Sequence, residues 1–388
     1  MELLPEPWEL ANLKFLFLLC LFFFSCKEKA VSEDKSIFYN PNSLISHSKR
    51  LQIQKYEDYT ILRVKPFQNE DLTETYILVD KDKPNPPDSI PRTHIIRTPV
   101  KRVICLSATH AGIISFLGEE ETLVGLSDPE IIYDLKIKDH IQNTRIPKVG
   151  FPNNLNIELI LSLKPDMLMV SGFSVAESRV YDVLRESNIP VIQNADWLED
   201  TPLGRAEWIK FVSHFYQKYH MASVQFEYIK DQYNLLVQKV SSVTDKPGVI
   251  HSLPYKGVWY MPGGNSYMAK FYKDAGVNYY WSFTKERGSI PMDFETVYPR
   301  GLSSEFWLAP GIVKTRTELA QIDKRFQDFL SYKTGRIYNY NKLTNQNGGN
   351  AYWERGMINP HEILSDLIKI FHPDLLPDHQ LIYFDKVK

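Results

Sequence analysis

Aromatic and cationic side chains near the ends of predicted strands are the residues of this chain best suited to hold a ligand. Aromatic residues make up 13% of the sequence, with 22 Tyr and 7 Trp, which fits either large cores or a site for a flat or bulky ligand. A guanidinium group pairs well with anionic oxygens. The candidate ligand-binding residues are Phe151, Trp197, Arg205, Tyr255, Trp259, Arg300, Trp353 and Arg355.

Histidine spacing gives little reason to expect a metal site. The chain has ten His, with no pair four residues apart on a helix and no His-Glu-x-x-His motif. His110 and His251 lie in or after predicted strands of different halves, so a zinc or haem role is open for them. A histidine satisfied by core or cleft contacts is the simpler interpretation.

Enzyme signatures are weak, although one hydrolase hypothesis is open. Residues 172–176 follow a predicted strand and precede a helix, but they lack the final glycine of a nucleophile elbow. No phosphate-binding glycine loop with Gly-Lys-Ser/Thr occurs. The alternative function is therefore a cell-envelope serine hydrolase that uses Ser107 or Ser174 with His110 or His251. We expect no catalytic residue and no enzyme activity under the main hypothesis below.

The elements that must position these residues are clearest between Val100 and Gly172. Apolar runs at 103–106, 123–127 and 167–170 predict buried strands that end in small or polar residues. Predicted helices at 110–117 and after Asn156, which can cap a helix, separate these strands. Strands alternating with helices indicate an α/β lobe with a largely parallel sheet, whose ligands bind at the carboxyl ends of the strands. The loops that begin at Ser107, Gly150, Ser171 and Asn194 are the expected binding loops.

Three further patterns extend this organisation. Runs at 51–56, 59–64, 75–79 and 94–97 predict a small β extension before the lobe. Apolar residues from His220 to Val240 recur at steps of three and four, which predicts one long amphipathic helix. Strands and helices then alternate again after Lys246, which predicts a second α/β lobe.

Several runs resemble one family. "RVICLS", "LVGLSD" and "PKVGFPNNLNIELILSLKPDMLMVSG" are similar to the amino-terminal lobe of the ABC-transporter substrate-binding proteins for cobalamin, ferric siderophores and haem, and "WYMPGGNSYMAKFYKDAGV" resembles their second lobe. The resemblance implies two Rossmann-like lobes joined by a long rigid helix, with cargo held in the interlobe cleft. It also implies that Glu158 and Glu295, near helix amino termini, dock on the permease, although a helix dipole favours acids there in any case.

The resemblance further implies a ferric siderophore, cobalamin or haem as bound cargo, with no resident cofactor and no metal ligated by the protein itself. Candidate arginines near the cleft favour an anionic metal chelate over neutral cobalamin. The expected partners are this small molecule and the ABC permease with its ATPase. A net charge of −2 gives no reason to expect nucleic acid, and a monomer is expected.

The amino-terminal segment predicts export and lipidation. An apolar run at 15–24 precedes Ser25 and Cys26, which resembles the lipobox of bacterial lipoproteins. Cleavage before Cys26 would leave it as the lipidation site, and Cys105 alone in an apolar run gives no disulfide partner. We expect a periplasm-facing lipoprotein of a Gram-negative bacterium, anchored in either membrane. A surface-exposed scavenger that serves an outer-membrane receptor is a further alternative.

The expected fold class is therefore α/β, with two Rossmann-like lobes, a long joining helix and a small N-terminal β extension. The expected boundaries are a signal peptide at 1–25, a tether at 26–49, the β extension packed on the first lobe at 50–98, the N-terminal lobe at 99–203, linking helices at 204–245 and the C-terminal lobe at 246–388.

Overall fold

Four short parallel strands form the sheet of the N-terminal lobe. Their order is β6-β5-β7-β8, and apolar side chains cover both faces, as the continuous hydrophobic runs predict. The strands are β5 (Val103–Cys105), β6 (Leu123–Leu126), β7 (Met167–Ser171) and β8 (Val191–Asn194). The helices and 3-10 turns around this sheet are α2 (Ala108–Phe116), η3 (Glu120–Thr122), η4 (Pro129–Ile131), α3 (Leu135–Thr144), α4 (Ile157–Leu163) and α5 (Val175–Glu186).

This computed structural model describes residues 44–66, 72–87, 95–171, 175–311 and 313–388. The predicted signal peptide, most of the predicted tether, the lipidation site Cys26 and Ser174 lie outside the described residues. No helix in the described part of the chain is both long enough and apolar enough to cross a membrane.

The β extension forms a sheet of its own beside the N-terminal lobe. Strands β1 to β4 pair in sequence order, antiparallel except for the parallel pair β3–β4. Their bounds are β1 (Leu51–Lys55), β2 (Tyr59–Val64), β3 (Glu74–Asp80) and β4 (Ile95–Thr98). The hydroxyl of Tyr76 accepts a hydrogen bond from the backbone N–H of Gln193 in β8 (2.9 Å). Leu62 and Leu78 belong to the same buried cluster as Val103, so the extension shares the core of the lobe.

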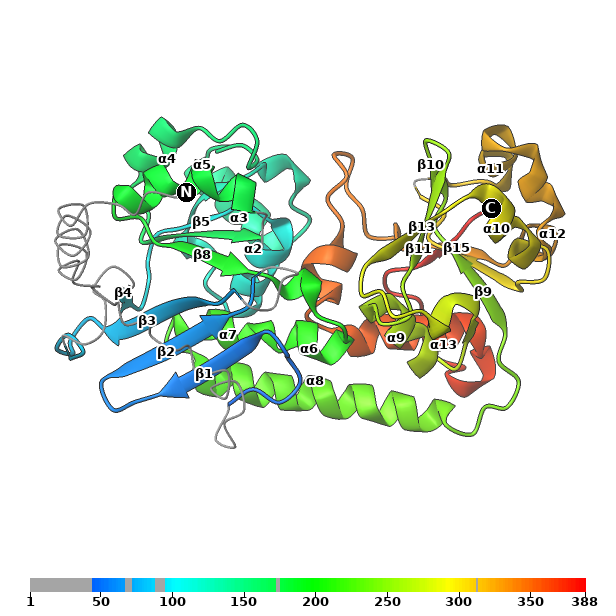
Figure 1. Ribbon diagram of the computed structural model, residues 1–388, viewed down its shortest axis with the longest axis horizontal. Helices are drawn as coiled ribbons and strands as arrows, with labels where there is room; N and C mark the ends of the chain where they lie inside the picture. Colours follow the sequence, from blue (N-terminus) through cyan, green and yellow to red (C-terminus); the bar gives the residue numbers. More distant parts are fainter. Residues whose placement is uncertain (1–43, 67–71, 88–94, 172–174, 312) are drawn as a thin grey trace, which may run out of the picture. The chain divides into compact units, whose positions relative to one another are not determined.

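The predicted long helix is α8 (Tyr219–Val240), which runs beneath both lobes in Figure 1 and packs on α7 and α13. Its buried face belongs to two cores. Ala222, Phe226 and Ile229 lie in the cluster of the N-terminal lobe, whereas Tyr233 and Val240 lie in that of the C-terminal lobe. The helix therefore joins the lobes as predicted. The shorter elements before it are η5 (Asp196–Leu198), α6 (Pro202–Ala206) and α7 (Trp208–His214).

The C-terminal lobe contains two sheets. A five-stranded sheet has the order β12-β9-β14-β15-β16, parallel except for β16, and a small antiparallel sheet has the order β10-β11-β13. The strands are β9 (Gly248–His251), β10 (Pro254–Tyr255), β11 (Val258–Pro262), β12 (Asn278–Tyr279), β13 (Ser289–Met292), β14 (Phe306–Leu308), β15 (Ile337–Asn339) and β16 (Asp385–Lys386).

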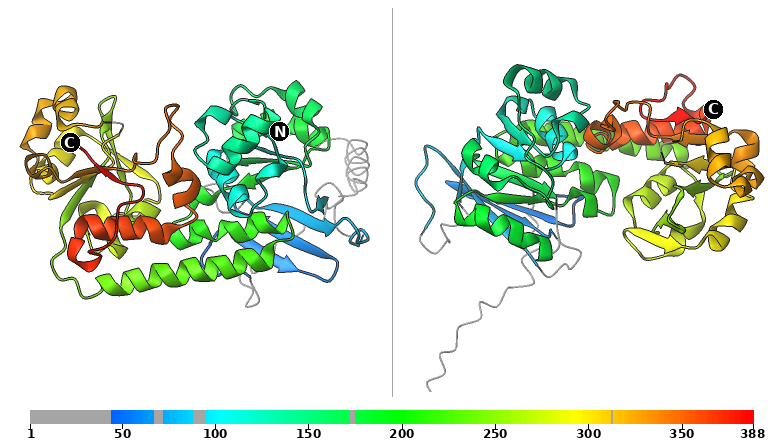
Figure 2. Two further views of the ribbon diagram at one scale, coloured as in Figure 1. Left: turned by 180° about the vertical axis from the view of Figure 1, so that it is seen from behind. Right: turned by 90° about the horizontal axis from the view of Figure 1, so that it is seen from above.

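Helices surround these sheets, as the views in Figure 2 show from behind and from above. Pro360 at the first position of α13 and serine or aspartate caps on α9 and α10 mark helix starts that the sequence signals. The helical elements are α9 (Tyr267–Asp274), η6 (Tyr280–Phe283), α10 (Phe294–Gly301), α11 (Arg316–Ile322), η7 (Lys324–Asp328), α12 (Leu330–Thr334), η8 (Tyr352–Gly356), α13 (Pro360–Phe371) and η9 (Pro373–Leu375).

Candidate functional site

A pocket of about 860 Å³ lies where residues of both lobes and of the β extension meet, and we call it the cleft pocket. The N-terminal lobe contributes Trp197 and Leu198, which follow the carboxyl end of β8, and Arg50 precedes β1. The C-terminal lobe contributes most of the lining, including His251 at the end of β9 and Tyr340 just after β15. The pocket therefore lies at the carboxyl ends of parallel strands, where the α/β topology places ligands.

Aromatic rings dominate the walls of the cleft pocket. Short elements place them there: β11 carries Tyr260, the first turn of α9 carries Tyr267, and the single-turn π-helix η8 carries Tyr352 and Trp353. Turns of this rare type often mark functional positions. The six aromatic lining residues are Trp197, Tyr260, Tyr267, Tyr340, Tyr352 and Trp353. Such walls suit a flat or bulky ligand.

The polar lining has a net positive formal charge among the described residues. Arg50 and Arg287 line the pocket with the single carboxylate of Glu286, and Nε of Arg287 lies 3.3 Å from Oδ1 of Asp200, outside the lining. His251 is neutral at pH 7, because burial lowers its pKa to about 4. Its Nδ1 lies 2.6 Å from the hydroxyl of Tyr272, which fixes the ring orientation. The pocket can therefore accept an anionic ligand.

A buried charge network lies behind the aromatic wall. Arg205 donates from Nε to Oδ2 of Asp196 (2.7 Å), and Nε2 of His110 lies 3.5 Å from Oδ1 of the same carboxylate. The guanidinium of Arg205 also lies 5.3 Å from the ring centroid of Tyr267. Burial alone would raise the pKa of Asp196, but Arg205 and His110 hold it below its usual value. The network therefore supports Tyr267 from behind, and its charges compensate one another.

Hydrogen bonds from the loop at Tyr133 and Asp134 to Glu354, which we call the polar seam, join the lobes beside the pocket. Glu354 follows the lining residues Tyr352 and Trp353, and its carboxylate accepts backbone N–H bonds from Tyr133 (2.7 Å) and Asp134 (2.8 Å) of the N-terminal lobe. Glu354 is 2% exposed, and burial raises its pKa to about 7.

Helix α2 approaches the same turn closely. A Cβ at Gly112 would lie 2.4 Å from the carbonyl oxygen of Glu354, so only glycine fits there. Asn345 adds a bond from Nδ2 to the carbonyl of Ile132 (2.9 Å). The lobes are thus connected beside the pocket as well as through α8.

The structure brings together two of the eight ligand-binding candidates in the cleft pocket, Trp197 and Trp353. Arg205 is buried in the network behind the wall. Trp259 is 0% exposed, donates from Nε1 to the carbonyl of His251 (2.8 Å), and packs against Trp307, so it is a core residue and not a ligand contact.

The other four candidates do not line the cleft pocket. Phe151 and Tyr255 are exposed on loops or strand ends outside its lining. The guanidinium of Arg300 lies 3.5 Å from the ring centroid of Tyr280, and Arg355 forms an ion pair with Glu362. Both arginines therefore have partners on their own lobe.

Most residues that line the cleft pocket are not among the candidates that the sequence predicts. Arg50 was assigned to the start of the β extension, and Arg287, Tyr260, Tyr267, Tyr340 and Tyr352 carried no separate signal. The glycine turn at Gly263 and Gly264 was the one available hint, because it opens the helix that begins with Tyr267.

The two acidic candidates are exposed in the first turns of their helices. Glu158 follows the cap Asn156 in α4, and Glu295 follows the cap Asp293 in α10. Both helices lie on the upper side of Figure 1. The guanidinium of Arg325 lies 3.7 Å from Glu295.

The hydrolase hypothesis finds no support among the described residues. No hydrogen bond joins Ser107 to His110 or His251 there, and Ser174 is not described. Within the same residues, no group of three or more His, Cys, Asp or Glu side chains is arranged to hold a metal ion.

Known proteins share this fold and sequence pattern. The family model "Periplasmic binding protein" matches residues 103–300. An uncharacterized lipoprotein of Methanocaldococcus jannaschii is 24% identical over 373 residues, which cover 89% of this chain and 86% of that protein.

Solved structures with this fold include a periplasmic haem-binding protein of Pseudomonas aeruginosa (TM-score 0.53, 15% identity, 74% of this chain and 98% of that one). The periplasmic catecholate-siderophore binding protein of Vibrio cholerae is similar to the same degree (TM-score 0.51, 16% identity, 68% and 94%). The prediction of a binding protein and not an enzyme is confirmed, because the chain belongs to the periplasmic binding protein family, the substrate-binding proteins of ABC transporters.

Proposed function

We propose that this protein captures a metal chelate in the cleft pocket and delivers it to an ABC permease. The cargo is a ferric siderophore, haem or a corrinoid, and the lining favours an anionic complex over neutral cobalamin. The observation that carries this proposal is the pocket itself: six aromatic rings and two arginines surround about 860 Å³ at the strand ends. That volume falls in the usual range of about 300–1,000 Å³ for small-molecule sites.

The arginines that line the pocket differ from those that the sequence suggested. Arg205, Arg300 and Arg355 are engaged with Asp196, Tyr280 and Glu362. Arg50 and Arg287 line the pocket itself, where Arg287 pairs with Asp200 (3.3 Å) and Arg50 donates to the carbonyls of Leu198 and Lys65, so their charges, although partnered, face the cargo site. The names of two similar structures, a haem-binding and a catecholate-siderophore binding protein, agree with a cargo that is flat or rich in aromatic rings.

Delivery to a permease would use the exposed acids Glu158 and Glu295, one on each lobe. Exposed charge pairs of this kind set orientation and association rate more than affinity. We further propose that Cys26 carries a lipid anchor and that the protein acts outside the cytoplasm. A relative named as a lipoprotein supports the anchor, but it is archaeal, so the expectation of a Gram-negative source has no support.

Tryptophan fluorescence tests the proposed function directly, because Trp197 and Trp353 line the pocket. Purified protein is titrated with a ferric tris-catecholate, haemin and cyanocobalamin. We expect quenching with a sub-micromolar dissociation constant for at least one of these probes, strongest for an anionic one. The double variant Trp197→Phe/Trp353→Phe should lose most of the quenching. Absence of binding to all three probes would contradict the proposal.

A further inference from the structure

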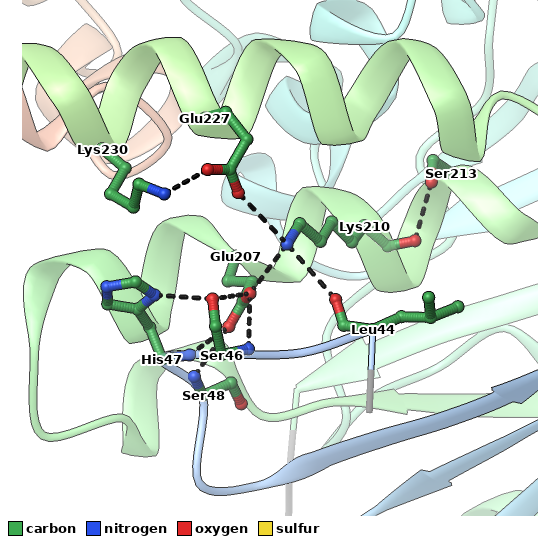
Figure 3. Close-up of polar contacts among 9 residues, drawn as sticks. All are labelled: Leu44, Ser46, His47, Ser48, Glu207, Lys210, Ser213, Glu227 and Lys230. Atoms are coloured by element: carbon green, nitrogen blue, oxygen red, sulfur yellow. Dashed lines mark hydrogen bonds and ion pairs between the residues drawn. The ribbon is translucent and has the colours of Figure 1, made fainter. Parts of the chain in front are cut away.

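The last residues of the predicted tether are held firmly on the N-terminal lobe. Residues 44–50, which we call the strap, contact a buried carboxylate at the junction of α6 and α7 (Figure 3). Three successive backbone N–H groups, of Ser46 (2.9 Å), His47 (2.7 Å) and Ser48 (2.8 Å), donate to Glu207. The hydroxyl of Ser46 donates to the same group (3.0 Å), and Glu207 is 0% exposed.

Lys210 compensates the buried charge of Glu207 and adds a further contact to the strap. Its Nζ lies 2.9 Å from Glu207, donates to the carbonyl of Leu44 (3.3 Å) and lies 4.4 Å from the ring centroid of Phe226 in α8. Burial alone would raise the pKa of Glu207, but Lys210 and the strap N–H groups hold it below its usual value. Glu207 is therefore ionised at neutral pH and can hold all its donors.

The strap continues along the loop that follows β8. Ser48 donates from its hydroxyl to the buried carboxylate of Glu199, and the backbone N–H of Lys49 donates to the same group (3.3 Å). Glu199 also accepts from Nε1 of Trp208 in α7 (3.0 Å). The Nζ of Lys49 lies 3.3 Å from Asp200. These contacts fasten the strap to residues directly after the pocket residues Trp197 and Leu198.

The strap ends in the wall of the cleft pocket. Arg50 is 4% exposed, donates from Nε to the carbonyl of Leu198 (3.0 Å) and from Nη1 to that of Lys65 (3.1 Å), and lines the pocket beside Trp197. The strap thus connects Glu207, which holds residues 46–48, to the charged pocket residue Arg50 along one short segment. Glu207 itself does not line the pocket.

We propose that Glu207 is a positioning residue for cargo binding: it clamps the strap on the lobe and so places Arg50 and the Trp197 loop against the cargo. The segment that enters the body from the amino-terminal side is then part of the binding site and more than a spacer. The inference rests on the proposed function, because it concerns affinity for an anionic chelate in the same pocket.

The test uses the full-length protein and a ferric tris-catecholate as the probe. In the pair variant Glu207→Gln/Lys210→Met both buried charges disappear, a change that often leaves stability nearly unaltered, while the strap N–H groups lose their carboxylate. We expect the dissociation constant to rise at least tenfold, with faster hydrogen exchange at the amides of residues 46–48. Arg50→Met should weaken binding to a similar extent, and Arg50→Lys should restore part of it.

Combining the changes decides whether Glu207 acts through the strap. The triple variant combines Glu207→Gln/Lys210→Met with Arg50→Met. If Glu207 acts through the strap, the triple variant binds no more than about threefold more weakly than either the pair variant or Arg50→Met, because coupled residues are not additive. Independent contributions would instead multiply to about a hundredfold relative to wild type, or about tenfold relative to either parent, and would overturn the inference. Unchanged affinity in the pair variant would also overturn it, whether or not exchange at the strap amides increases.

The chain offers a matched control in the C-terminal lobe. Asp366 is also 0% exposed and accepts backbone N–H bonds from three successive residues, 382–384, but it does not line the cleft pocket. Asp366→Asn should lower stability and leave the dissociation constant within twofold; an equal loss of affinity would mean that any broken clamp disturbs binding and would overturn the inference.

A second route leaves Glu207, Lys210 and the backbone N–H donors of the strap in place. Ser46→Ala/Ser48→Ala changes only the strap, and it should weaken binding about threefold in the wild-type background and not in the Arg50→Met background. An effect of the same size in both backgrounds would contradict the inference. If the wild-type protein binds none of the three probes, the proposed function itself fails, which is distinguishable from a failure of the clamp alone.

Discussion

Replacing Glu354 should change how stability depends on pH. Its carboxylate crosses between the lobes to the N–H groups of Tyr133 and Asp134, and burial raises its pKa from 4.5 to about 7. The N–H bonds from Tyr133 and Asp134 oppose this rise in the pKa, the charge of Asp134 adds to it, and that of Lys138 opposes it. In the unfolded chain the glutamate ionises near its ordinary value, but the folded protein keeps the proton until about pH 7.

The sign of the effect follows from this difference. Between about pH 4.5 and 7 the unfolded state has lost the proton and the folded state has not, so stability falls as pH rises. The full contribution corresponds to roughly 3 kcal/mol, since each pKa unit is worth about 1.4 kcal/mol. Glu354→Gln removes the titration and resembles the protonated side chain. The stability of the variant relative to wild type should therefore increase by up to about 3 kcal/mol from pH 5 to pH 8.

Urea unfolding at pH 5, 6, 7 and 8, followed by circular dichroism, measures this difference. Buried His214 and His251, whose pKa values burial lowers to about 4, add stability as pH rises over an overlapping range. Because both proteins contain these histidines, their contribution cancels in the comparison. A difference between variant and wild type that stays constant with pH, or that falls as pH rises, would refute the reasoning about Glu354.

Three other predictions concern residues that the sequence singled out. Trp259→Ala should lower the free energy of unfolding by about 3–5 kcal/mol in a denaturant titration, yet leave cargo affinity of the folded protein within threefold. Arg205→Met should lower the free energy of unfolding, measured by calorimetry, by about 3–5 kcal/mol, because Asp196 stays buried and charged. Adding Asp196→Asn should recover most of this loss. Glu158→Lys/Glu295→Lys should leave melting temperature and cargo affinity unchanged but reduce uptake in permease-containing vesicles several-fold, most at low salt; normal uptake would exclude the docking role.

Hydrophobic periodicity was enough to predict most of the fold. The continuous apolar run at 167–170 became the buried strand β7, and the three-and-four spacing after His220 became α8. These signals are local, because burial of one helical face or of both strand faces leaves a repeating pattern in the sequence. The end of the tether was missed for the opposite reason: the strap is irregular and is held by contacts to Glu199 and Glu207, some 150 residues away.

The binding site was harder to predict because it depends on side-chain direction. Trp259 and Tyr260 are neighbours on β11, and successive residues of a strand point to opposite sides. Trp259 therefore enters the aromatic core, while Tyr260 is 45% exposed and lines the pocket. Position after a strand end points to this region of the chain but does not decide which of two adjacent rings lines the pocket.

Buried carboxylates explain how irregular segments come to form a defined pocket. A carboxylate has two oxygens that together accept several hydrogen bonds, so it can hold successive N–H groups that no helix or sheet satisfies. Glu207 holds the strap in this way, and Glu354 holds the seam beside Tyr352 and Trp353. Both clamps act on segments that line or border the cleft pocket, whereas the parallel sheets only set the frame. Under the proposed function, we therefore expect changes in the clamped segments to alter cargo preference while the lobes and α8 keep their packing.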